Sequence, residues 1–269
     1  MLNITLVCAS IEDEKYYFMK RLFSLIFVLF TLMVFSAQSH PLRLAVAANA
    51  QFVIKALQAD FKKRTGIETE AIIGSSGNLT AQIKNGAPYD IFLSADMNFP
   101  NTLFKEGFAI TKPKEYASGS LIVCSTGNPD LKNWQKLLTG DGIKKIAIAN
   151  PSVAPYGKAA EEALRYYVLW NKVNSKLVYG ENISQVNTYI TTGTVDIGFT
   201  TEALIYEYAE KEKLKWERID KSVYEKIRQG FIILSYSKKE NYSKAQMFYN
   251  YILSPEAKKI FKQFGYLVS

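Results

Sequence analysis

Short apolar runs alternate with segments of helical spacing along this chain, and no other feature restricts its fold as strongly. Apolar runs occur at 42–47, 70–73 and 89–93, helical spacing occupies the first interval at 50–64, and another helix-like segment follows at 98–106. Strands that alternate with helices pair in parallel, and the helices cover the faces of the sheet. We therefore predict one α/β unit from this part of the chain.

The alternation begins again further along. Strand-like runs at 145–149, 177–179 and 196–200 alternate with helix-like segments at 157–169 and 183–190. No tract rich in Pro, Gly or Ser separates the two cycles, so strands rather than a flexible linker are expected to join them. The predicted fold class is α/β with two lobes, each a mostly parallel sheet flanked by helices.

Two segments, 116–124 and 226–235, are candidates for carrying the chain between the lobes. Two crossings bring the last helices back to the first lobe. The predicted domains are therefore a first lobe of residues 40–120 plus 230–269 and a second lobe of residues 121–229.

The N-terminal leader, residues 1–39, carries the pattern of a secretory signal peptide. Lys20 and Arg21 precede a fourteen-residue apolar run at 22–35, and small residues follow up to Ser39. A basic region, a short apolar core and a small-residue exit predict cleavage, here after Ser39, and export to the periplasm. An uncleaved anchor is the alternative, although fourteen residues are few for a membrane span.

The basic region of the leader indicates where translation begins. A signal peptide starts close to its basic region, so we hypothesise that Met19 is the true start and that residues 1–18 are not translated. Ala37 is the alternative cleavage position. Cys8 lies before the apolar core, so it is not a lipid-anchor cysteine.

Composition narrows the function classes. The chain has 269 residues, with 33 Lys and Arg against 25 Asp and Glu, for a formal net charge of +8. This charge is compatible with a nucleic acid, an anionic membrane or a small oxyanion as partner. Two cysteines exclude a disulfide framework, and Cys124 falls in a run that we expect to be a buried strand.

Motifs for catalysis are missing from the sequence. No phosphate-binding loop, dinucleotide-binding fingerprint or nucleophile elbow occurs, and the single histidine, His40, lies at the start of the exported chain. Glu161 and Glu162 are expected on a solvated helix face. We predict that the chain is not an enzyme and that it holds no cofactor and no bare metal ion.

Small and hydroxyl-bearing residues fill four turns that lead from a strand into a helix: 47–50, 74–78, 150–157 and 180–183. Ligands of open α/β sheets bind at these carboxyl ends of strands. Helix N-termini there offer free N–H groups and positive dipole ends, which bind anions without a charged side chain. Any one turn alone is explained more simply by helix capping, from Asn49, from Ser75 or Ser76, or from Asn182.

The chain resembles the periplasmic molybdate-binding proteins, the substrate-binding subunits of molybdate ABC importers, over residues 42–268. The most specific block is GSSGNLTAQIKNGAPYDIFLSAD at 74–96. Four further blocks agree: LAVAANAQF (44–52), IAIANPSVAPYGKAAEEAL (146–164), GENISQVNTYITTGTVDIGF (180–199) and FYNYILSPEAKKIFKQFGY (248–266). The resemblance implies a type II periplasmic-binding-protein-like fold whose hinged lobes close over a tetrahedral dianion.

The resemblance also implies a set of binding residues. In the first lobe it points to Asn49 with its neighbour Ala48, and to Ser76. In the second lobe it points to Tyr156 and Ile183, each through its backbone N–H.

Three positions depart from the pattern of many family members, which have Ser at 49, Ala at 156 and Tyr at 201. The hydroxyl of that tyrosine contacts the anion. In this chain, either Thr201 donates a shorter hydroxyl bond or Tyr156 replaces the missing phenol.

Molybdate is fully deprotonated at neutral pH, so a site made only of hydrogen-bond donors suits it. Sulfate has the same charge and shape but is smaller, so its rejection must rest on cavity size. Tungstate is nearly isosteric with molybdate, and no strong discrimination between the two is expected.

The predicted function is capture of molybdate, and of tungstate, for delivery to an inner-membrane permease and its ATPase. We expect a monomer that does not bind nucleic acid. The alternatives are a binding protein for sulfate, thiosulfate or another tetrahedral oxyanion, and a periplasmic sensor that reports the anion to a membrane partner.

Overall fold

The computed structural model describes residues 19–24, 40–127, 129–208 and 213–268. The chain divides into two compact units, Met1–His40 and Pro41–Ser269. In the first unit, residues 19–24 are helical and exposed, whereas the cleavage site predicted at Ser39 and most of the apolar run before it lie outside the described residues. In the described part of the chain, no helix combines the length and apolar character needed to cross a membrane.

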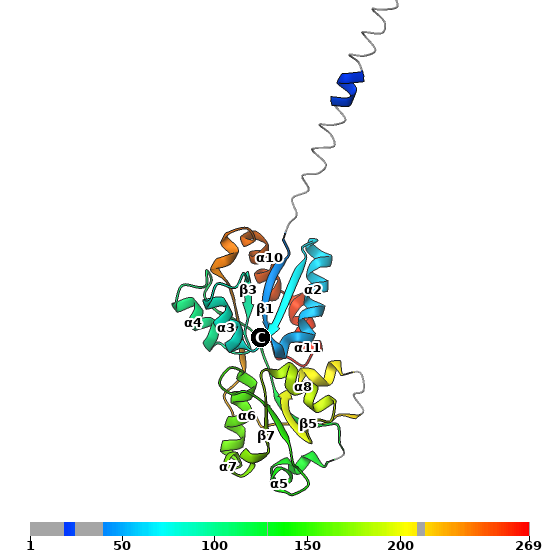
Figure 1. The fold of residues 1–269 in the computed structure, drawn as a ribbon, viewed down its shortest axis with the longest axis vertical. Helices are drawn as coiled ribbons and strands as arrows, with labels where there is room; N and C mark the ends of the chain where they lie inside the picture. The colour runs from blue at the N-terminus through cyan, green and yellow to red at the C-terminus, as the bar shows by residue number, and fades with distance from the viewer. Residues whose placement is uncertain (1–18, 25–39, 128, 209–212, 269) are drawn as a thin grey trace, which may run out of the picture. The chain divides into compact units, whose positions relative to one another are not determined.

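The second unit contains two five-stranded sheets, of which the first has the order β2-β1-β3-β10-β4 (Figure 1). Its strands are β1 (Leu42–Ala47), β2 (Thr69–Gly74), β3 (Ile91–Leu93), β4 (Lys114–Ser118) and β10 (Arg228–Ile233). β1 pairs in parallel with β2 and β3, whereas β10 is antiparallel to β3 and β4. Only Arg43 of β1 is exposed, as expected for a strand covered on both faces.

The second sheet repeats this design with the order β7-β6-β8-β5-β9. Its strands are β5 (Leu121–Ser125), β6 (Ile146–Ala149), β7 (Leu177–Gly180), β8 (Ile197–Thr201) and β9 (Lys215–Arg218). β6 is parallel to β7 and β8, and β5 is antiparallel to β8 and β9. In each sheet, four strands point one way and the strand in fourth place points the other way. Cys124 lies in the fully buried β5, as predicted.

Helices flank both sheets. The helices that pack with the first sheet are α2 (Gln51–Thr65), α3 (Ser76–Lys84), α4 (Asn98–Lys105), α10 (Tyr242–Ile252) and α11 (Pro255–Gln263). The segment of the second sheet contains α5 (Trp134–Thr139), α6 (Pro155–Tyr166), α7 (Trp170–Val173), α8 (Ile183–Thr191) and α9 (Ala203–Glu207). Short 3-10 turns are η1 (Ala48–Ala50), η2 (Leu131–Asn133), η3 (Asn174–Lys176) and η5 (Ser235–Lys238). We call each sheet with its helices a lobe, the first and the second. The two sheets flanked by helices confirm the predicted two-lobe α/β fold.

Two segments connect the lobes. The outward connection is short, because only Gly119 and Ser120 separate β4 from β5. The return connection is the segment 219–227, between β9 and β10. α10 and α11 then follow β10 and pack into the core of the first lobe.

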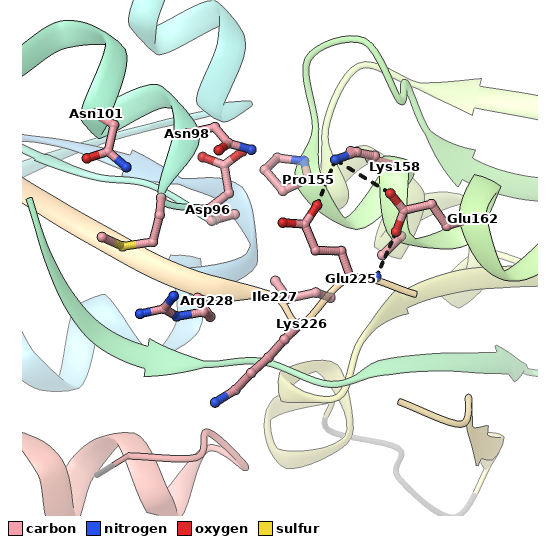
Figure 2. A pocket seen from close by; sticks show the side chains of 13 residues that line it. Asp96, Asn98, Asn101, Pro155, Lys158, Glu162, Glu225, Lys226, Ile227 and Arg228 are labelled. Atoms are coloured by element: carbon pink, nitrogen blue, oxygen red, sulfur yellow. Dashed lines mark hydrogen bonds and ion pairs between the residues drawn. The ribbon is translucent and has the colours of Figure 1, made fainter. Parts of the chain in front are cut away.

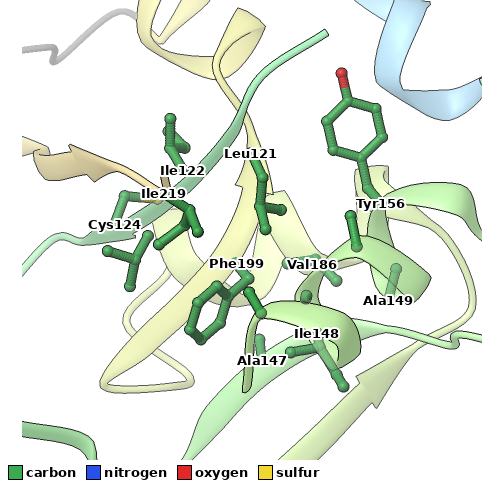
Figure 3. Close-up of a cluster of buried hydrophobic side chains, with 14 of the residues drawn as sticks. Leu121, Ile122, Cys124, Ala147, Ile148, Ala149, Tyr156, Val186, Phe199 and Ile219 are labelled. Carbon is green, nitrogen blue, oxygen red and sulfur yellow. The ribbon is translucent and has the colours of Figure 1, made fainter. Parts of the chain in front are cut away.

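Each lobe has its own apolar core. In the second lobe, the cluster gathers around Phe199 of β8 (Figure 3). Trp134 packs edge-on against Phe199 with ring centroids 5.5 Å apart. In the first lobe, Phe61 of α2 packs edge-on against Phe248 of α10 with centroids 5.0 Å apart. The two cores are built from segments far apart in sequence, and they fix the turns that face each other between the lobes.

Predicted and observed bounds differ most among the helices at the one predicted over 157–169. The spacing of apolar residues predicts a helix over 157–169, whereas α6 begins at Pro155 and ends at Tyr166. Proline suits the first helical position because an N–H there has no acceptor within the helix, so its absence costs nothing. The end is set by Val168, whose φ of +56° is incompatible with continued helix and turns the chain toward α7.

Candidate functional site

The four predicted turns meet between the lobes. β1 and β2 pair with Ala47 opposite Gly74, and β6 and β7 pair with Ala149 opposite Gly180, so the turns after each pair of strands lie side by side. Residues of all four turns line a small cavity of about 10 Å³ that is partly open to solvent. We call this space the interlobe cavity, and its lining is Ala47, Ala48, Asn49, Ser75, Ser76, Ala95, Ala154, Pro155, Tyr156, Asn182 and Ile183.

The two serines of the second turn have different roles. Ser75 caps α3, because its Oγ accepts a hydrogen bond from the Asn78 N–H at 3.3 Å. Ser76 is the first residue of α3, and its Oγ accepts a hydrogen bond from the Ala95 N–H at 3.0 Å. A hydroxyl that accepts one bond keeps its own proton to donate. Ser76 is therefore held in place and offers a hydroxyl donor to the cavity.

The second lobe lines the cavity with backbone from the first turns of α6 and α8. Tyr156 lies in the first turn of α6 and Ile183 opens α8, where N–H groups have no acceptor within their own helix. Asn182 caps α8 through its side-chain oxygen, as the capping interpretation predicts. Gly157 lets α6 begin directly against the end of β6, since a Cβ there would lie 2.2 Å from the carbonyl oxygen of Ala149.

Asn49 is not a helix cap. Its Nδ2 donates to Gln229 Oε1 at 2.9 Å and to the Tyr266 hydroxyl at 3.4 Å. Its Oδ1 is buried and has no hydrogen-bond partner among the described residues. The sequence suggests that the Asn49 amide donates to the ligand, but here both amide protons face protein atoms. The donors that this turn offers are the backbone N–H groups of Ala48 and Asn49, at the start of η1.

Thr201 is the one predicted site residue that does not line the cavity. Its Oγ1 donates to the Tyr156 hydroxyl at 3.2 Å. Figure 3 shows this hydroxyl pointing away from the second-lobe core. Burial raises the pKa of Tyr156 well above its usual value, so the phenol stays neutral and keeps its proton. Thr201 therefore contacts the site through Tyr156.

The cavity is electrically neutral in its side chains but rich in donors. Of the described residues that line it, none carries a charged side chain. The first turns of α3, α6 and α8 supply N–H groups and the positive ends of helix dipoles. Such a site binds a small anion whose oxygens only accept hydrogen bonds.

Contacts across the cleft show that the lobes are closed. The Gly77 N–H donates to the Val153 carbonyl oxygen at 2.9 Å, and Asn78 Nδ2 donates to Glu181 Oε1 at 2.7 Å. A third bond joins the Ser184 hydroxyl to the Gln51 side-chain oxygen. These three contacts join residues of opposite lobes in or beside the turns that line the cavity.

A larger cavity between α4, α6 and the return connection is less suited to an anion (Figure 2). Its lining includes three carboxylates, from Asp96, Glu162 and Glu225, and three cations, from Lys158, Lys226 and Arg228. Lys158 is paired with Glu225 at 2.9 Å and Glu162 at 3.5 Å, and Arg228 is paired with Glu115 at 2.7 Å. An oxyanion there would meet carboxylates and cations that are already paired, whereas the interlobe cavity offers N–H donors at helix N-termini and no carboxylate.

Two residues around the site carry no local sequence signal. Gln229 and Tyr266 bond to the Asn49 side chain from 180 and 217 positions away along the chain. Neither lies in a turn after a strand, and only the return of the chain to the first lobe brings them close. A three-dimensional arrangement was needed to find them.

Comparison with known proteins identifies the family. The family model described as "Bacterial extracellular solute-binding protein" matches residues 42–267. The molybdate-binding protein ModA of Azotobacter vinelandii is 33% identical over 236 residues, which cover 87% of this chain and 93% of the relative. ModA of Rhodobacter capsulatus is 31% identical, covering 83% and 86%.

A solved structure agrees with these relatives. The periplasmic molybdate-binding protein of Azotobacter vinelandii superposes with a TM-score of 0.79 at 33% identity, over 85% of this chain and 99% of that one. The predicted periplasmic-binding-protein-like fold and the resemblance to molybdate-binding proteins are thereby confirmed. This chain belongs to the bacterial extracellular solute-binding proteins, and molybdate-binding proteins are among its relatives.

Proposed function

We propose that this protein captures molybdate and passes it to a molybdate ABC importer. The observation that carries the proposal is the interlobe cavity, which both lobes line with N–H and hydroxyl donors and without a charged side chain. Relatives that share about a third of its residues are named molybdate-binding proteins. As predicted, the chain belongs to a family of binding proteins and not of enzymes.

The chemistry of the donors supports an oxyanion without protons. Toward the cavity, Ser76 and the first-turn amides of Tyr156 and Ile183 offer donors, since the Ser76 hydroxyl already accepts from the Ala95 N–H, and molybdate only accepts. A protonated phosphate would need an acceptor, and a carboxylate in the lining would serve that purpose. Tungstate offers the same charge and nearly the same size, so we include it in the proposal.

The lobes are proposed to move as hinged bodies, residues 40–120 plus 230–269 against residues 121–229. The ligand stabilises the closed form because it bonds to both lobes at once. The closed protein then docks on a membrane permease driven by an ATPase. Export through a signal peptide cleaved after Ser39, translation from Met19 and a monomeric state belong to the same proposal.

A thermal-shift screen against molybdate, tungstate, sulfate and phosphate tests the function. A ligand that binds only the folded protein raises the melting temperature, and the stabilisation grows with the logarithm of the ligand concentration divided by its dissociation constant. We expect a large shift with molybdate and tungstate and a much smaller one with sulfate and phosphate. A larger shift with sulfate would favour the alternative of a sulfate-binding protein, and no shift with any anion would refute the proposal.

A further inference from the structure

Gln229 is a buried polar residue that the binding proposal has not used. It lies on β10, where the register with β4 shifts between Gln229 and Gly230, and its side chain is 0% exposed. Burial of a neutral amide is costly unless its donors and acceptor are hydrogen bonded. The bonds of Gln229 therefore decide which way its side chain is held.

The side chain of Gln229 is bonded to one cavity residue of each lobe. Its Oε1 accepts from Asn49 Nδ2 of the first lobe at 2.9 Å, and its Nε2 donates to the Tyr156 hydroxyl of the second lobe at 3.3 Å. The Tyr116 hydroxyl lies 2.7 Å from the same Oε1. The Gln229 oxygen thus faces Asn49 and Tyr116, and its nitrogen faces Tyr156.

The outward connection approaches the same contact. A Cβ on Gly119 would lie 1.8 Å from the Tyr156 hydroxyl and 2.8 Å from Gln229 Nε2. Glycine at position 119 therefore leaves the room in which Tyr156 and Gln229 meet. Gly119 of the outward connection therefore lies directly against this bond between the lobes.

Other side chains also hold Asn49 and Tyr156, the two partners of Gln229. The Tyr266 hydroxyl donates to the Asn49 carbonyl oxygen at 2.7 Å, and Thr201 donates to the Tyr156 hydroxyl at 3.2 Å. Without Gln229, the Asn49 amide keeps only the 3.4 Å bond to Tyr266. The Asn49 side chain, in the turn that carries the Ala48 and Asn49 N–H groups, then loses its shorter hydrogen bond.

We infer that Gln229 is a positioning residue of the interlobe cavity. It holds Asn49 of the first lobe and Tyr156 of the second lobe in place, beside Gly119 of the outward connection. The inference rests on the proposed function. Gln229 does not line the cavity, so it acts on the anion only through these two residues.

Gln229→Met tests this role, because it keeps the length of the side chain and removes its hydrogen bonds. We expect molybdate affinity, measured by calorimetry on the purified protein, to fall about tenfold or more. Gln58→Met is the matched control. It removes a 3.0 Å bond from Gln58 Nε2 to the Thr69 carbonyl within the first lobe, and affinity should not change.

A double variant separates positioning from a general loss of stability. Tyr156→Phe removes the hydroxyl that Gln229 contacts and keeps the backbone N–H. If Gln229 acts through Tyr156, the double variant binds molybdate about as well as the weaker single variant, since the same connection is broken twice. If Gln229 only stabilises the fold, the two losses of affinity multiply.

The outcomes distinguish this inference from the proposed function. If the unsubstituted protein binds neither molybdate nor sulfate, both ideas fail. If it binds molybdate and Gln229→Met matches the Gln58→Met control, or if the losses multiply, only the role of Gln229 is wrong. Should circular dichroism show that Gln229→Met is unfolded, Gln229→Asn, which keeps the amide but shortens its reach, takes its place with the same expected loss.

Discussion

Replacing Gly77 by alanine is expected to hinder closure of the lobes without unfolding either one. Gly77 lies in the first turn of α3, and its N–H donates to the Val153 carbonyl oxygen across the cleft at 2.9 Å. A Cβ at position 77 would lie 2.9 Å from both Cα and Cβ of Val153. The obstacle includes backbone, so no side-chain rotation removes it.

The magnitude follows from where the strain falls. Overpacking of this kind costs about 1–3 kcal/mol. The cost applies to the closed form alone, because the nearest atoms all belong to Val153 of the opposite lobe and separate from Gly77 on opening. Binding requires closure, so the dissociation constant for molybdate should rise by about 5- to 150-fold. The unliganded stability should not fall, since alanine is a better helix former than glycine.

Calorimetry with molybdate, thermal unfolding without ligand and small-angle scattering with and without molybdate together test this prediction. Gly142→Ala is the control, because no atom lies within 4 Å of a Cβ built there. We expect Gly77→Ala to bind more weakly, to melt no earlier than the unsubstituted protein, and to compact less with ligand. Unchanged affinity would show that the lobes do not approach each other as closely as this structure has them.

Three further predictions concern the cavity and the core. Ser76→Ala should weaken molybdate binding by about 1–3 kcal/mol, the range for a lost bond to a charged group, whereas unchanged affinity by calorimetry would remove Ser76 from the site. Molybdate affinity should stay constant from pH 6 to 9: burial raises the pKa of Tyr156, so its phenol ionises only above this window, and a slope in titrations across it would contradict a site of neutral donors. Burial also raises the pKa of Cys124 to about 12, so mass spectrometry should find this thiol alkylated at pH 8 only after denaturation, and rapid labelling of the folded protein would contradict its burial.

The lobes could be predicted because each element carries its own local signal. In α2, the buried residues Val53, Leu57 and Phe61 have helical spacing, and Gly66 ends the helix with a φ of +72°. β1 is a continuous apolar run, which is typical of a strand covered on both faces. Such patterns need no knowledge of distant residues.

The end of α6 could not be predicted in this way. Apolar residues continue at helical spacing through Val168 and Leu169, and neither Gly nor Pro marks a stop. The structure places Val168 in the left-handed region, after which Leu169 and Val173 are buried in the core of the second lobe. The spacing of apolar residues alone does not show this turn.

The candidate site was likewise predictable only in part. Its walls were predictable because turns of small residues follow strands whose ends meet, and five of the six predicted residues line one cavity. The residues that hold this lining in place were not predictable. Gln229 and Tyr266 reach Asn49 from the far end of the chain, and Thr201 contacts the Tyr156 hydroxyl instead of the cavity.

The most direct test of the account is calorimetric titration of molybdate into the purified protein in the presence of a large excess of sulfate. If the cavity rejects sulfate by size, as we propose, the titration should show one molybdate bound per chain, with an affinity that the sulfate reduces little. Absence of binding heat without sulfate, or complete loss of molybdate binding in its presence, would contradict the claim that the interlobe cavity selects molybdate.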